Sequence, residues 1–102
     1  MDATSFPHRD TLFGFQHYGF TTDSTAPFPA NIEPFIDGLN AVIPSKMPNV
    51  TFGSYVNYID ASLTAQKAHQ VYYGDVTYST LLYIKQEYDS SHVFWNPQAI
   101  GN

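Results

Sequence analysis

The sequence contains no cysteine in its 102 residues. This absence excludes disulfides, thiolate catalysis and cysteine-based zinc sites within the chain. Charged residues are few, at 13%, and the formal net charge is −5 because the only basic residues are Arg9, Lys46, Lys67 and Lys85. Nucleic acids and anionic membrane surfaces attract clusters of Lys and Arg, so we expect no nucleic-acid binding and no membrane binding.

Two kinds of targeting segment are missing as well. No run approaches the roughly 18 apolar residues of a membrane span. The first five residues, MDATS, lack the basic stretch and apolar core of a secretory signal. From this chain alone we therefore expect a cytoplasmic protein.

Sequence signals for bound metals and phosphates are also lacking. The four histidines have no metal-ligand spacing, and no glycine-rich phosphate loop is present. We expect no metal site and no cofactor bound by this chain alone. Aromatic residues, in contrast, make up 17% of the chain, with eight Tyr and eight Phe. Because tyrosine combines an apolar body with a hydroxyl group that needs a partner, this abundance favours a polar-lined cavity or an interface.

Helical periodicity occurs in three segments. Apolar residues recur at helical spacing between Ile32 and Ile43, with Asn31 as a good N-cap and Pro44 as the expected end. Residues 64–73 predict a short helix that ends at Gly74. Residues 75–88 predict a longer helix, and residues 89–100 read as a loop.

Two segments show the alternation of side chains between two faces that is typical of strands: residues 12–20 (LFGFQHYGF) and residues 52–59 (FGSYVNYI). An isolated pair of strands has open edges and is marginal in water. We therefore predict a single α+β domain over residues 1–102. It would contain a small antiparallel sheet, with two to three helices packed on one face, completed by dimerisation or by a partner chain.

Several motifs resemble the C-terminal region of the berberine bridge enzyme family of FAD-linked oxidoreductases. The segment from Tyr55 to Asp60 is similar to the family's YxNYxD, and Tyr72-Tyr73-Gly74 to its YYG. Downstream similarities, in the family's order, are Tyr78, Leu81-Leu82, Ile84-Lys85, Tyr88-Asp89, Val93-Phe94 and residues 96–100 (NPQAI). Upstream, Phe6-Pro7-His8-Arg9 resembles the FPHR loop. The resemblance implies a substrate-side domain, without the flavin domain and its covalent His and Cys attachment points.

The chain also departs from the family pattern. Thr77 and Thr80 replace an asparagine and an arginine, Ser90 replaces a proline and His92 an asparagine. In the family this region docks onto the flavin domain, so these changes suggest that such docking is no longer required.

The resemblance assigns the candidate site residues. Tyr55 takes the position of the active-site tyrosine that removes a hydroxyl proton, and Gln16, 39 residues earlier, that of the Glu or Gln opposite it. An amide can orient a substrate but cannot act as a base. The candidate substrate-binding residues are Tyr58, Asn57, His17, Tyr18 and His8. A packing or surface role is the alternative for each of these residues.

Three hypotheses follow, and whether the chain is an enzyme is left open. The leading one is a cofactor-independent cyclase or isomerase of secondary metabolism, acting on a small natural product with Tyr55 as general acid or base. The second is the substrate-side portion of an FAD-linked oxidoreductase that needs a flavin-binding partner; full-length relatives of that kind are often secreted. The third is a non-catalytic binding remnant. A small-molecule substrate, and a homodimer or a flavin-domain partner, are the expected partners.

Overall fold

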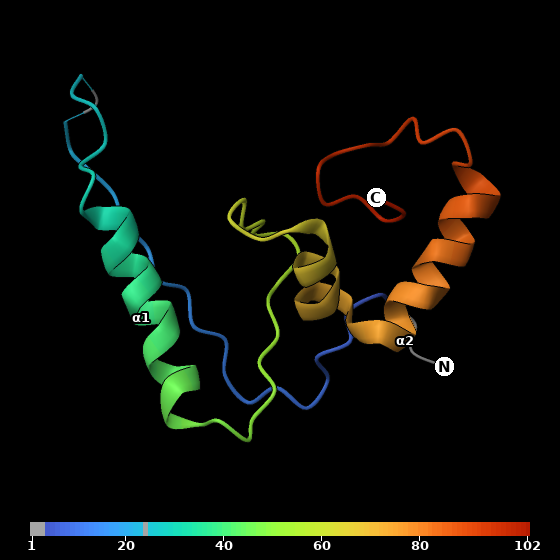
Figure 1. Cartoon of the computed structure of the whole chain (residues 1–102), viewed down its shortest axis with the longest axis horizontal. Helices are drawn as coiled ribbons and strands as arrows, with labels where there is room; N and C mark the ends of the chain where they lie inside the picture. Colours follow the sequence, from blue (N-terminus) through green and yellow to red (C-terminus); the bar gives the residue numbers. More distant parts are fainter. Residues whose placement is uncertain (1–3, 24) are drawn as a thin grey trace. The chain divides into compact units, whose positions relative to one another are not determined.

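The computed structural model describes residues 4–23 and 25–102, which form two compact units (Figure 1). One unit combines the start of the chain, up to Asp10, with Phe52–Asn102, and the other is Thr11–Thr51. Within the described residues the secondary structure consists of helices α1 (Ile32–Lys46) and α2 (Ala65–Tyr88). Neither helix is long and apolar enough to cross a membrane.

The predicted α+β fold with an antiparallel sheet is wrong, because residues 4–23 and 25–102 contain no strand. In residues 52–59, the alternation is interrupted by a turn in which the Tyr58 amide donates to the Tyr55 carbonyl at 2.9 Å. Within residues 12–20, His17 and Gly19 lie against helix α1 rather than against another strand. A strand exists only through pairing with a neighbour, and alternating side chains do not supply one.

The Thr11–Thr51 unit contains α1 and, beside it, the segment around His17 and Gly19. His17 Nδ1 lies 2.6 Å from Asn40 Oδ1, so the two side chains share a hydrogen bond. A Cβ on Gly19 would lie 2.6 Å from a methyl group of Ile32, so the segment approaches α1 closely there. The segment therefore runs antiparallel to α1.

Helix α1 confirms the periodicity and the predicted N-cap position of Asn31, whereas the predicted end at Pro44 is wrong. Asn31 is the N-cap residue, but its side chain makes no capping hydrogen bond. The helix continues through Pro44 to Lys46. A proline so close to a C-terminus removes only one hydrogen bond of a turn that ends in any case, which explains why it does not stop the helix.

Helix α2 contains the predicted break at Gly74, whose φ of 64° and ψ of 170° are non-helical. Thr64 caps the first half, accepting from the Lys67 amide at 3.3 Å. The predicted loop after Tyr88 is confirmed: Asp89 accepts from the amides of Val93 and Phe94 at 2.7 and 3.1 Å and pairs with Lys85. The C-terminal segment thus folds back in a defined loop.

A small core joins this loop to the first half of α2. Ala68, His69, Tyr72 and Ala99 are its buried members among the described residues. Gln98 Nε2 donates to the carbonyls of Asp60 and Leu63 at 2.7 and 2.9 Å. The Tyr72 hydroxyl accepts from the Asp60 amide at 2.8 Å. These bonds hold the end of the 55–60 segment against the helix.

Candidate functional site

The break at Gly74 frees a backbone carbonyl group to which the residues of the candidate site are hydrogen-bonded. In an uninterrupted α-helix the carbonyl of Val71 would accept from the amide of Asp75, four residues on, across Gly74. Instead this carbonyl oxygen accepts from the Ser54 amide at 2.8 Å and lies 3.0 Å from His8 Nε2. One helical carbonyl therefore ties the FPHR loop and the YxNYxD segment to the same point.

Close backbone approach fixes His8 in this position. A Cβ added to Gly53 would lie 2.0 to 2.5 Å from atoms of the His8 imidazole, a distance that only glycine permits. Phe6 then bridges from His8 to Tyr55, with ring centroids 5.4 Å and 6.0 Å away in edge-to-face geometry. Such edge-to-face pairs are favourable arrangements of aromatic rings.

The resulting group, here called the Tyr55 cluster, contains Phe6, His8, Tyr55, Asn57 and Tyr58. The Tyr58 ring centroid lies 5.7 Å from that of Tyr55. Asn57 Nδ2 donates to the Tyr55 hydroxyl oxygen at 2.7 Å. About half of Tyr55 is exposed, so an external molecule can reach it.

This geometry suits proton transfer at a hydroxyl group. Because the Tyr55 oxygen accepts from Asn57, its own proton stays available for donation to another group. An N–H directed at the same oxygen also stabilises negative charge that develops there when the proton leaves. The cluster can therefore position a hydroxyl-bearing substrate and exchange a proton with it.

Tyr73, in the YYG motif, is poorly suited to the role of a base. Burial raises the pKa of Tyr73 above its ordinary value of 10.0, and the adjacent Tyr72 adds to the shift. A raised pKa means that a smaller fraction of Tyr73 is ionised at neutral pH, so less phenolate is available to accept a proton.

Three predicted site residues lie in the Thr11–Thr51 unit. Gln16 and Tyr18 are exposed, and His17, half-buried, pairs with Asn40 of α1. The Tyr18 ring lies 6.3 Å from that of Phe20. The pairing of Gln16 with Tyr55 stays a prediction, whereas His8, Asn57 and Tyr58 do lie together with Tyr55.

FAD is the cofactor that the resemblance implies for the family. Its pyrophosphate needs a glycine-rich cradle or free cations. Three of the four basic side chains already donate within the chain: Arg9 to Thr4, Lys67 to Gln70, and Lys85 to Asp89 and Phe94. That this chain alone binds no FAD stays a prediction.

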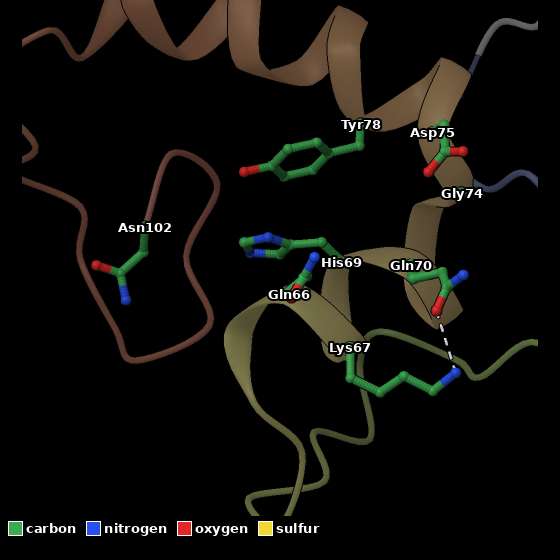
Figure 2. A pocket seen from close by; sticks show the side chains of 8 residues that line it. All are labelled: Gln66, Lys67, His69, Gln70, Gly74, Asp75, Tyr78 and Asn102. Atoms are coloured by element: carbon green, nitrogen blue, oxygen red, sulfur yellow. Dashed lines mark hydrogen bonds between the residues drawn. The ribbon is translucent and has the colours of Figure 1, made fainter.

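The sequence did not predict a hollow in the surface beside helix α2, which we call the α2 hollow. It measures about 580 Å³ and lies at the Gly74 break (Figure 2). Its lining comes from both halves of α2 and from the end of the chain: Gln66, Lys67, His69, Gln70, Gly74, Asp75, Tyr78 and Asn102. No sequence periodicity predicts the α2 hollow, because the backbone break at Gly74 and the C-terminal loop that folds back create it together.

Comparison with known proteins locates the chain in a family. Residues 54–101 match the family model described as "Berberine and berberine like". No solved structure matches the chain.

Among curated proteins, the chain is 36% identical over 97 residues to the chitooligosaccharide oxidase of Gibberella zeae. It is 35% identical to the glucooligosaccharide oxidase of Sarocladium strictum over 99 residues, and 35% identical to the FAD-linked oxidoreductase sorD of Penicillium rubens over 101 residues. These matches cover 93 to 95% of the chain and 19 to 20% of each relative. The chain thus spans about one fifth of the length of these relatives. Together with the matched motifs, these similarities show that the chain belongs to the berberine bridge enzyme family.

Proposed function

We propose that this chain forms the substrate-side part of an FAD-linked oxidoreductase that oxidises a hydroxyl group of a carbohydrate. The observation that carries the proposal is the Tyr55 cluster, in which Asn57 donates to the Tyr55 hydroxyl at 2.7 Å on an accessible surface. Relatives named as chitooligosaccharide and glucooligosaccharide oxidases support the substrate class.

Within such an enzyme the residues of this chain would bind, orient and move a proton. Tyr55, as the phenolate, takes the proton of the substrate hydroxyl, and the Asn57 amide stabilises this phenolate before the transfer. Tyr58 and Phe6 offer ring surface to the apolar face of a sugar. FAD, held by a separate polypeptide region, would supply the oxidation.

A cofactor-independent cyclase or isomerase acting on a small natural product is the second candidate. Thr77, Thr80, Ser90 and His92, which depart from the family pattern, favour it. This candidate uses the same Tyr55 as general acid or base but needs no flavin. The two candidates therefore differ in their dependence on FAD.

A chimera tests the proposal. The matching 97-residue region of the chitooligosaccharide oxidase is replaced by this chain, and hydrogen peroxide release is measured with cellobiose and with N,N′-diacetylchitobiose. We expect peroxide with at least one sugar, and none from the isolated chain with or without FAD. A correctly folded, flavin-loaded chimera that releases no peroxide would contradict the proposal. Turnover of a natural product by the isolated, colourless chain would instead establish the second candidate.

A further inference from the structure

The α2 hollow has a polar lining that the proposed reaction does not use, and Tyr55 is not part of that lining. Its volume of about 580 Å³ is within the roughly 300–1,000 Å³ of small-molecule sites. The side chains around it include amides, one imidazole, one ammonium and one carboxylate (Figure 2). The hollow therefore has the size and the chemistry of a site for a small polar molecule.

His69 provides the most constrained group in the hollow. Its residue surface is 6% exposed, and its Nε2 lies 3.1 and 3.0 Å from the carbonyl oxygens of Gln98 and Ala99. A carbonyl oxygen can only accept, so Nε2 carries a proton, and in the neutral imidazole Nδ1 is then an acceptor. Nδ1 makes no hydrogen bond among the described residues. A buried residue thus presents an unused acceptor.

Tyr78 fixes the orientation of this imidazole. The Tyr78 ring lies over the His69 ring in Figure 2. The two rings are stacked, with centroids 4.4 Å apart and an interplanar angle of 21°. The Tyr78 hydroxyl oxygen accepts from the Gly101 amide at 3.3 Å, which leaves its own proton available. An acceptor and a donor are therefore held in place by the core before any ligand arrives.

The rim of the hollow adds further hydrogen-bonding groups without a net charge. Lys67 Nζ donates to Gln70 Oε1 at 3.1 Å, and this bond leaves the Gln70 amide hydrogens free to donate. Asp75 offers carboxylate oxygens from the other side of the Gly74 break. One ammonium and one carboxylate balance each other, so a strongly anionic or cationic ligand gains little from this rim.

We propose that the α2 hollow binds a neutral polyhydroxylated molecule, specifically a sugar unit. Each sugar hydroxyl both donates and accepts, which matches a lining that contains both acceptors and donors. His69 Nδ1 and Asp75 accept from hydroxyl groups, while Gln70 and Tyr78 donate to them. The site is separate from the Tyr55 cluster and would hold carbohydrate without oxidising it.

The test is a titration of the ¹⁵N-labelled 102-residue chain with cellobiose, followed by amide chemical shifts. We expect saturable shifts centred on residues 66–70, 74–78 and 101–102. Gln70→Ala should weaken the apparent affinity about tenfold, the effect of losing one good hydrogen bond. The matched control Gln86→Ala, also exposed and on α2 but outside the hollow, should bind as the unmodified chain does.

The inference would be overturned by no saturable shift at any cellobiose concentration, by shifts confined to residues 55–58, or by an unchanged affinity in Gln70→Ala. Equal shifts with sodium sulfate at the same residues would point to anion binding instead, and would also overturn it. Because Gln70 and Gln86 are exposed, their alanine variants should keep the spectrum of the folded chain. Peroxide release by the chimera depends on the Tyr55 cluster, so failure here leaves the proposed function standing.

Discussion

At the scale of single residues, the two-residue spacing of Tyr55 and Asn57 determines whether their side chains form a hydrogen bond. The turn closed by the Tyr58 amide brings the Asn57 side chain back onto the Tyr55 hydroxyl. The resemblance identified both residues, but their contact depends on a turn that the alternating pattern did not predict. Local hydrogen bonding outweighed strand propensity because these residues have no strand neighbour.

Tyr55→Phe removes the hydroxyl that exchanges a proton in the proposed reaction. In the chimera we expect kcat/KM for the oligosaccharide to fall roughly 10²- to 10⁴-fold, the usual contribution of a general acid or base. Folding should be unaffected, because the Tyr55 ring is half exposed. Tyr88→Phe, which changes an 83% exposed tyrosine, is the matched control and should keep full activity. An equal loss in both variants would remove Tyr55 from the mechanism.

Asp89 makes the stability of the C-terminal loop depend on pH. The hydrogen bond from Lys85, with smaller contributions from the amides of Val93 and Phe94, lowers the pKa of Asp89 below its usual 3.8. A lowered pKa in the folded state means that ionised Asp89 stabilises the fold. This contribution is complete above the unfolded value of 3.8 and is lost as the pH falls below it, through the folded pKa.

The measurement is amide hydrogen exchange of Val93 and Phe94. Their protection should decline in acid, and Asp89→Asn should show the same low protection already at neutral pH. Glu87→Gln, at an exposed position of the same helix end, should behave like the unmodified chain. Protection that persists in Asp89→Asn would show that the carboxylate does not hold the loop.

At the scale of helices and turns, Gly74 has the largest structural effect. Its φ of 64° and ψ of 170° lie in a region that is nearly exclusive to glycine. The break separates the two halves of α2, frees the Val71 carbonyl for Ser54 and His8, and opens the α2 hollow. One backbone conformation therefore shapes both candidate sites.

Gly74→Ala should destabilise the chain by about 1–3 kcal/mol through backbone strain alone, because an added Cβ meets no atom within 4 Å. Gly38→Ala is the matched control: Gly38 also has open space around it, but its φ is ordinary and it lies inside α1. Alanine there should stabilise by about 0.4–1 kcal/mol. The denaturant midpoints of the two variants show whether each substitution stabilises or destabilises the chain. An unchanged midpoint in Gly74→Ala would contradict the strained conformation.

The helices were predictable because their signals are local. Apolar spacing from Ile32 to Ile43 and the glycine at position 74 required no knowledge of distant residues. The sheet was not predictable in this way, since whether residues 12–20 form a strand depends on what lies beside them, and here that neighbour is α1. The α2 hollow could not be predicted for the same reason. His69 contacts Tyr78 and approaches the last residues only because the helix breaks at Gly74 and the C-terminal loop folds back.

At the scale of the whole molecule, the buried core is small for the apolar content. Four residues are buried among those described, whereas many large apolar side chains are exposed, including Leu12, Val76, Tyr88, Phe94 and Trp95. Monomeric proteins rarely expose extensive apolar patches. This surface is consistent with the predicted homodimer or flavin-domain partner, which stays a prediction.

We expect the isolated chain to self-associate to a dimer or larger species in size-exclusion chromatography with light scattering. Association hides apolar surface from water, at roughly 25 cal/mol for each Å². Fluorescence of a dye that binds exposed apolar surface should be strong for the isolated chain and weak for the chimera, where the flavin-binding region is present. A monodisperse monomer with weak dye binding would contradict this expectation.

The central claim is that this chain supplies the proton-transfer residue for flavin-linked oxidation of a carbohydrate. The most direct measurement is the anaerobic rate at which an oligosaccharide bleaches the flavin absorbance of the chimera, with and without Tyr55→Phe. We predict bleaching in the chimera, slowed at least about 100-fold by the substitution. Bleaching at an unchanged rate after Tyr55→Phe, with the flavin still bound, would contradict the claim.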